Sequence, residues 1–158
     1  MAEFAYAPVQ VVEPNQNVIL DTVIPCNRGR VYHRNQSGIV ILRGIVDCPT
    51  SCFARYQVTA NANIALPDGA TVGPISIALA IDGEPIQTSK AIVTPAATAE
   101  DPPTANNFFN ITSTAIITVP KGCCFSVAVE NTSAPAAAGG VAPEILVSNA
   151  NVTVSRIA

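Results

Sequence analysis

The sequence predicts an all-β protein, a sandwich or jelly roll of about ten antiparallel strands. Three observations support this prediction. Apolar and polar residues alternate with period two in several segments, and apolar residues nowhere recur at helical spacing over three turns. Most of the 13 prolines and 9 glycines fall between the alternating segments. Alternation of this kind is typical of strands that bury one face.

The longest expected strand covers residues 54–66. Its even positions from Ala54 to Leu66 are apolar, whereas its odd positions from Arg55 to Asn63 are polar. A second strand, 75–81, ends at Asp82-Gly83, a dipeptide suited to the positive φ angles of a tight hairpin turn. A third covers 125–130. The other expected strands are 3–12, 17–24, 30–34, 38–46, 88–94, 108–119 and 144–157.

Two segments interrupt this rhythm, 94–107 and 133–143. Both consist mainly of small residues and prolines, which cannot build a core. They are therefore expected to be surface loops at the ends of the sandwich. We expect a single domain over residues 1–158, with residues 1–16 as a docking or edge segment.

The composition favours a protein that associates with other subunits. Only 12% of the residues are charged and the mean hydropathy is +0.36, which is apolar for a soluble domain. A net charge of -3 gives no general attraction to nucleic acids or anionic lipids. No apolar run is long enough to span a bilayer, and the N-terminal residues do not resemble a secretion signal. We expect a soluble, unprocessed protein that binds neither nucleic acid nor membrane.

The charge is unevenly distributed. Residues 26–57 contain five arginines, Arg28, Arg30, Arg34, Arg43 and Arg55, but only one acidic residue, Asp47. These arginines either occupy solvated turns or meet an acidic partner, such as the acidic part of a neighbouring copy.

The sequence lacks the residue patterns of common enzymes. Its single histidine, His33, has no carboxylate and nucleophile at a convincing spacing, and we expect it at a turn or strand edge. No phosphate-binding glycine loop, paired-carboxylate motif or HExxH zinc motif occurs. The sequence therefore predicts a protein that is not an enzyme and has no cofactor.

The five cysteines, Cys26, Cys48, Cys52, Cys123 and Cys124, cannot all pair within one chain. Cys48 and Cys52 could both reach one zinc ion, with His33 or the adjacent Cys123 and Cys124 completing the site. A disulfide within this set is a second interpretation. Reduced thiols are the default in the absence of an export signal, and no metal site is predicted.

Aromatic residues are scarce and are candidates for contacts between subunits, because each buries a large area at little entropic cost. Tyr56, Phe108 and Phe109 are the candidates for a subunit interface. Phe4, Tyr6, Arg28, Arg30 and Arg34 are the candidates for docking onto a larger structure.

A series of motifs resembles a family of short proteins encoded by bacteriophages and by Firmicutes genomes that carry prophages. The motifs are Tyr32–Arg34, Gly38–Ile45, Val72–Pro85, Val119–Cys124 and Val129–Thr132, and the resemblance covers most of residues 17–157. It implies a jelly roll similar to the globular heads of tumour necrosis factor and complement C1q, which associate as trimers. Phages use such modules as head decoration proteins or head fibres, and the family has no catalytic residues.

Together these features predict a homotrimeric decoration or stabilising protein bound to the major capsid protein of a phage. It would lie on the virion surface and assemble in the bacterial cytoplasm. The alternative is a receptor-type or glycan-binding module on a phage or bacterial surface, with its ligand held by loops 94–107 and 133–143.

Overall fold

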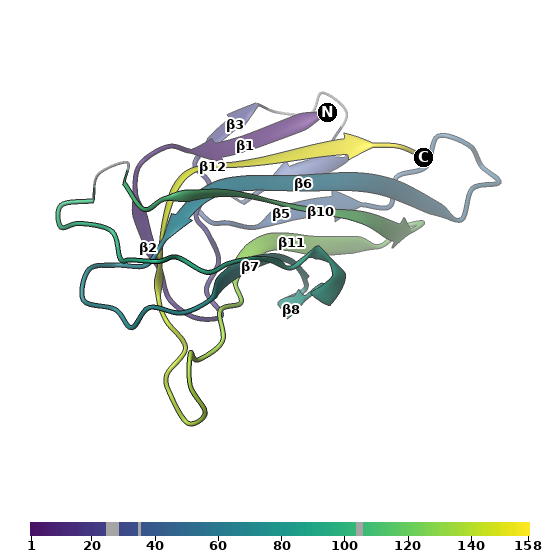
Figure 1. Cartoon of the computed structure of the whole chain (residues 1–158). Coiled ribbons are helices and arrows are strands. Elements are labelled where there is room, and N and C mark those ends of the chain that lie inside the picture. The colour runs from purple at the N-terminus through teal and green to yellow at the C-terminus, as the bar shows by residue number, and fades with distance from the viewer. Residues whose placement is uncertain (25–28, 35, 104–105) are drawn as a thin grey trace.

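The computed structural model describes residues 1–24, 29–34, 36–103 and 106–158, which form strands joined by loops and turns (Figure 1). Within them, the one helical element is a short 3₁₀ turn, so the prediction of an all-β protein is confirmed. In chain order the elements are β1 (Ala2–Tyr6), β2 (Gln10–Val12), β3 (Thr22–Ile24), β4 (Val31–His33), β5 (Val40–Arg43), β6 (Phe53–Ala65), β7 (Ile75–Ile81), β8 (Glu84–Pro85), η1 (Gln87–Ser89), β9 (Ala91–Val93), β10 (Phe109–Pro120), β11 (Cys124–Asn131) and β12 (Ile145–Arg156).

The strands form two antiparallel sheets with nested pairing. Sheet A has the order β10-β6-β12-β1-β3, and β2 also pairs with β12. Sheet B has the order β4-β5-β11-β7-β8, and β9 also pairs with β7. The first strands of the chain thus pair with the last, β5 pairs with β11, β6 with β10 and β7 with β9. A long hairpin folded in this way over two sheets is a jelly roll, as predicted.

The core lies between the two sheets and follows the alternation in the sequence. In β6, the even positions from Ala54 to Ile64 are at most 2% exposed, while Arg55 and Gln57 between them face solvent. Leu42, Leu79 and Ile117 meet these residues from β5, β7 and β10. Burial of these apolar side chains on the inner faces is the main force that holds the sheets together.

Strand β7 differs from the prediction because both of its faces are buried. Alternation over 75–81 puts Ser76, Ala78 and Ala80 on the face opposite to Ile75, Ile77 and Leu79, yet they too are only 2%, 0% and 1% exposed. The Ser76 hydroxyl lies 3.1 Å from that of Thr132, and Ala78 lies beside Glu130 of β11 in the register. Longer neighbouring side chains shield these small residues from solvent, although they do not belong to the core between the sheets.

The turn at Asp82-Gly83 is confirmed as a tight hairpin, since both residues have positive φ angles, 50° and 85°. The return strand is irregular, because η1 interrupts it between β8 and β9. There the Ser89 hydroxyl accepts the Leu79 N–H at 3.0 Å. A side chain thereby replaces the missing main-chain partner of β7.

The N-terminal segment is built into sheet A. The expected strand 3–12 is split into β1 and β2 around Pro8, and β1 lies between β12 and β3. Of the expected strand 17–24, only β3 is regular, while Asn17 and Leu20 form isolated bridges. Residues 1–16 thus pair within their own chain, and β1 is not an edge strand.

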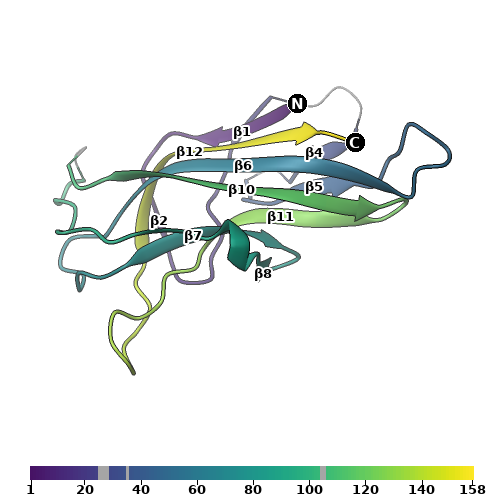
Figure 2. The same ribbon diagram turned by 45° about the vertical axis from the view of Figure 1, so that its right-hand side comes forward.

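The loops gather at two ends of the sandwich (Figures 1 and 2). One end, called the terminal end, carries both termini, the 44–52 loop and the 121–123 turn. The other, called the loop end, carries residues 66–74, the described parts of 94–108 and residues 132–144. The segment 133–143 and the described parts of 94–107 are therefore surface loops, as predicted.

Candidate functional site

The outer face of sheet A is covered by rows of hydroxyl and amide side chains that cross three strands. Thr112, Asn61 and Asn151 form one row, and Thr114, Thr59 and Thr153 form the next. The Asn61 amide donates to Thr112 Oγ1 at 3.3 Å, and the hydroxyl of Thr114 donates to that of Thr59 at 3.2 Å. These six residues are called the polar face below.

Few charges lie on this side of the sheet. Among the outward positions of β1, β6, β10 and β12, only Glu3 and Arg55 are ionisable. Toward the terminal end the face becomes apolar, because Ile116 is 64% exposed and Phe53 is 42% exposed. The Arg55 guanidinium lies over the Phe53 ring, 4.9 Å from the ring centre, and partly covers that ring.

A groove of about 460 Å³ lies at the loop-end margin of the polar face. It is called the asparagine groove, because amides from three strands line it: Asn63 of β6, Asn110 of β10 and Asn149 of β12. The remaining lining residues are Ala7, Pro8, Val9, Pro103, Phe108 and Ser148.

Two features fix the geometry of the asparagine groove. The amide nitrogen of Asn110 donates to Oδ1 of Asn61 at 2.7 Å and to Oδ1 of Asn63 at 2.9 Å. Strand β12 carries a bulge between Ser148 and Asn151, and within it Asn149 adopts a left-handed φ of 49°. The Asn149 N–H donates to the Ala7 carbonyl, which ties the bulge to the chain between β1 and β2. Bulges commonly re-aim side chains in this way.

A second cleft, of about 400 Å³, separates the 66–74 loop from the 132–144 loop. Asp68 and Glu144 line it together with Ala136, Val141 and small or proline residues. The 133–143 loop therefore contributes to a cleft that carries two carboxylates, whereas Pro103 of the 94–107 loop reaches the asparagine groove.

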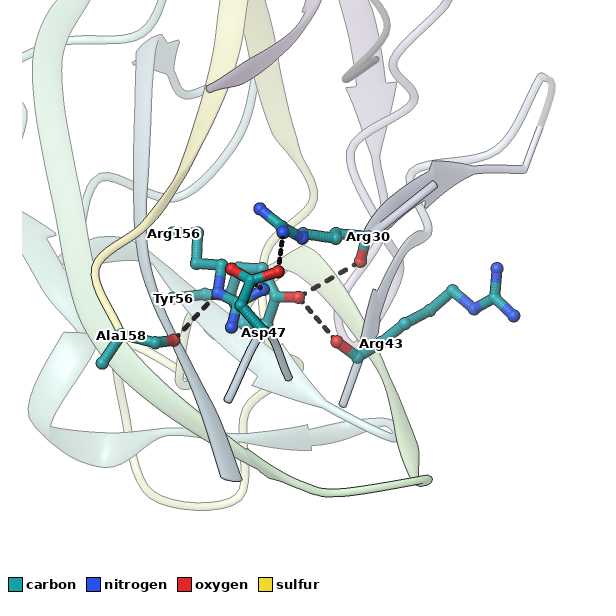
Figure 3. Close-up of polar contacts among 6 residues, drawn as sticks. All are labelled: Arg30, Arg43, Asp47, Tyr56, Arg156 and Ala158. Atoms are coloured by element: carbon teal, nitrogen blue, oxygen red, sulfur yellow. Dashed lines mark hydrogen bonds and ion pairs between the residues drawn. The ribbon is translucent and has the colours of Figure 1, made fainter. Parts of the chain in front are cut away.

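The terminal end holds a cluster of arginines around Asp47 (Figure 3). Arg30 forms an ion pair with one carboxylate oxygen of Asp47, and Nη1 of Arg156 lies 3.5 Å from the other. Nε of Arg156 donates to the Ala158 main-chain oxygen at 3.0 Å. The single acid of the basic segment thus neutralises part of its charge.

The other arginines of the basic segment are placed separately. Arg43 donates to the Gly29 carbonyl at 3.2 Å, and Arg34 is exposed. Arg28 lies outside the described residues. The arginines therefore do not form one continuous basic surface in the part of the chain that the structure describes.

Two aromatic candidates for external contacts are core residues. Tyr56 is 0% exposed, so it cannot contact a neighbouring subunit in this fold, and the alternation of β6 places it inside. Phe4 is 1% exposed and stacks on the His33 ring with 5.1 Å between centroids, so it is not a docking residue. Tyr6, Phe108 and Phe109 are half-buried, and their external contacts stay predictions.

The histidine has a structural environment. His33 lies on β4, the outer strand of sheet B, and is 6% exposed. Its Nε2 lies 2.8 Å from the Ser37 carbonyl and donates a hydrogen bond to it. No partner for Nδ1 is present among the described residues.

Four exposed thiols, Cys48, Cys52, Cys123 and Cys124, lie at the terminal end. Hydrogen bonds join the two loops that carry them, since the Gly44 N–H donates to the Cys123 carbonyl at 2.8 Å and the Lys121 N–H to the Cys52 carbonyl at 2.9 Å. None of these four is in a disulfide, and Cys26 lies outside the described residues. Within the described ranges, no three His, Cys, Asp or Glu side chains are placed to hold a metal ion.

No motif in the sequence predicts the asparagine groove. The one available signal was the pair Asn61 and Asn63 at period two, followed by Asn110 in the strand expected over 108–119. Any half-buried strand carries polar side chains at alternate positions, so such a pair does not distinguish a site. The bulge that brings Asn149 into the groove left no pattern in the sequence.

No family model matches this chain, and no curated protein matches it in sequence. Its fold is similar to that of the globular domain of the zebrafish complement 1qA protein, with 10% identity and a TM-score of 0.49 over 99% of this chain and 97% of that chain. It is also similar to the C-terminal domain of EclA, a sugar-binding protein, with 14% identity and a TM-score of 0.41 over 95% and 79% of the two chains.

A third similar structure is a xylan-binding domain from Paenibacillus barcinonensis, with 9% identity and a TM-score of 0.34 over 99% and 87% of the two chains. These likenesses concern the course of the chain alone. No helix among the described residues is long and apolar enough to cross a membrane.

Proposed function

We propose that this chain is a structural protein that forms a homotrimer and decorates or stabilises a bacteriophage capsid. The observation that carries the proposal is the outer face of sheet A. It combines two exposed apolar side chains, Ile116 and Phe53, with only two ionisable residues on four strands. Interfaces are depleted in charge at their centres and enriched in large apolar residues.

The resemblance of the motif series to phage jelly-roll proteins supports the capsid as the partner and the virion surface as the location. The described structure also favours a role without catalysis, because His33 is packed against Phe4 and hydrogen-bonded to the Ser37 carbonyl. Attachment of three copies would convert weak single contacts with the capsid into durable binding.

Light scattering of the purified protein tests the assembly. We expect a particle with about three times the 16.3 kDa protomer mass at micromolar concentration. Ile116→Lys should shift the population to monomers, because a charge without a partner would be buried in the contact. Val141→Lys is the matched control, since Val141 is 90% exposed on a loop away from the face. A monomeric wild-type protein would refute the homotrimer.

The capsid requires its own experiment. Electron microscopy of the source particle should show knobs with three-fold symmetry on the shell, and purified protein should bind stripped shells and raise their melting temperature. Shells that neither carry nor bind the protein would refute the decoration role while leaving the trimer intact.

A second candidate, a receptor-type or glycan-binding module, is favoured by one observation, the absence of ionisable side chains from the asparagine groove. Labelled protein that stains host cells but leaves shell stability unchanged would favour this candidate over decoration.

A further inference from the structure

The asparagine groove differs in charge from the other surface clefts described for this chain. The cleft at the loop end contains Asp68 and Glu144, and the two clefts at the terminal end contain Arg30 and Arg156. The asparagine groove has amides and a hydroxyl but no ionisable group. A charged ligand would lose its hydration there without gaining a counter-charge.

Hydrogen bonds hold the amides of the groove in position and leave some of their donors and acceptors available to a ligand. Both protons of the Asn110 amide nitrogen are used by Asn61 and Asn63. This leaves Oδ1 of Asn110 as an acceptor and Nδ2 of Asn63 as a donor on the groove surface. An apolar ligand would cover these groups without bonding them, which is costly.

The bulge adds a third amide from the opposite wall. Asn149 is exposed although it lies within a long strand, because the bulge gives it a left-handed backbone and places it on the groove surface. Ser148 next to it adds a hydroxyl to the same wall. Polar groups from β6, β10 and β12 therefore converge on one concave surface.

The groove also has an aromatic wall. Phe108 packs against the small cluster of Ala65, Ala99 and Leu146, which anchors the side chain, and it lines the groove. An anchored ring beside converging amides matches the surface of a pyranose, which has an apolar C–H face and a rim of hydroxyl groups.

We propose that the asparagine groove binds a neutral saccharide chain, with Phe108 stacking on a sugar ring and the amides of Asn63, Asn110 and Asn149 bonding its hydroxyls. The inference deepens the second candidate function and rests on it, but it does not require the homotrimer. Asn110 and Ile116 are six residues apart on β10, about 20 Å, so ligand and subunit contacts use different parts of the face.

The test combines a glycan array with affinity electrophoresis. The array carries neutral hexose, pentose and N-acetylhexosamine chains beside sialylated, uronic and sulfated ones, and the gels contain the neutral polysaccharides that bind. We expect binding to neutral chains only, with no loss between low and high salt, because no ion pair contributes.

Two variants assign the binding to the groove. Asn149→Gly removes an amide while keeping the left-handed backbone, and Asn110→Ala removes an exposed side chain. Each should weaken binding by roughly fivefold to tenfold, the usual loss for one hydrogen-bonding side chain. Asn15→Gly is the matched control, since Asn15 also has a left-handed φ, 62°, but lies on a turn that does not line the groove.

The outcomes separate the proposals. Absence of binding to every neutral chain, binding to acidic chains alone, or full binding by both groove variants with unchanged melting temperatures would each overturn the saccharide site. A monomeric Ile116→Lys protein that keeps wild-type sugar binding would support it independently of assembly. Failure of the wild-type protein to form trimers would bear only on the structural proposal.

Discussion

The hydroxyl of Tyr56, a residue that is 0% exposed, donates a 2.6 Å hydrogen bond to the main-chain carbonyl of Arg43 (Figure 3). Tyr56 belongs to β6 of sheet A and Arg43 ends β5 of sheet B, so the bond crosses from one sheet to the other. The same hydroxyl lies 3.4 Å from the Arg30 carbonyl. The aromatic body fills the core while its polar tip finds a main-chain partner, as buried tyrosines usually require.

This relationship predicts a graded response to substitution at Tyr56. The Arg43 carbonyl also accepts the Ile45 N–H, so Tyr56→Phe would remove the short bond from the hydroxyl without leaving that carbonyl unpaired. We expect a loss of about 1 kcal/mol in the free energy of unfolding for Tyr56→Phe, and about 3–5 kcal/mol for Tyr56→Ala, which leaves a cavity. Urea denaturation measures both. Tyr32→Phe, at a residue 62% exposed, is the control and should change little.

Gly44 should not tolerate a side chain, because a Cβ there would lie 1.9 Å from the Pro120 carbonyl oxygen. The glycine begins the loop between β5 and β6 and is bonded to the 121–123 turn. Its N–H donates to the Cys123 carbonyl, and its carbonyl accepts the Gly122 N–H. Gly44→Ala should cost at least about 3 kcal/mol or prevent folding. Gly69→Asn, at an open turn with φ of 73°, should be nearly neutral. Equal melting temperatures for the two variants would contradict this account.

Period-two alternation determined most of what was predicted correctly. It placed Val58 and Ile64 inside and Gln57 outside, because an unbroken strand sends successive side chains to opposite faces. It failed where burial depends on distant parts of the chain. Ser76 is covered at its hydroxyl by Thr132, which is 56 residues away in the sequence.

The candidate site was less predictable than the fold. Asn149 reaches the groove only because a bulge shifts the register of β12, and nothing in the local sequence specifies that extra residue. Phe4 and Tyr56 are candidates for external contacts in the sequence because aromatic residues favour interfaces as well as cores. Their positions in alternating segments predict their burial more reliably, since each lies on the same strand face as small or branched apolar residues.

Glu130 should make stability depend on pH. Its side chain is 5% exposed, and no hydrogen bond or ion pair to its carboxylate is present among the described residues. Burial, with a smaller contribution from Glu84, raises the pKa of Glu130 above its ordinary value. The folded state therefore holds its proton more tightly than the unfolded state. Stability from this group is complete below the unfolded pKa and is lost as the pH rises through the folded pKa.

Glu130→Gln should therefore stabilise the protein at neutral pH by about 1 kcal/mol, since the amide carries no charge to desolvate. The gain should vanish below the ordinary range of a glutamate pKa. Melting temperatures of both proteins between pH 3 and pH 8 measure the difference. Glu144→Gln, at an exposed residue, is the control. A constant offset across the pH range would show that packing, not charge, separates the two proteins.

Cys48 should react faster with electrophiles than its exposure alone explains. Its Sγ lies 3.0 Å from the Thr50 hydroxyl, and this hydrogen bond lowers the pKa of the Cys48 thiol below its ordinary value. The thiolate is the nucleophile, so Thr50→Val should slow alkylation of Cys48 by iodoacetamide several-fold near neutral pH. Mass spectrometry of the peptides after brief labelling measures the rate, with Cys124 as the internal reference. If the variant slows Cys48 and Cys124 equally, the loop conformation and not the hydroxyl controls the reaction, because of these two thiols only that of Cys48 contacts the Thr50 hydroxyl.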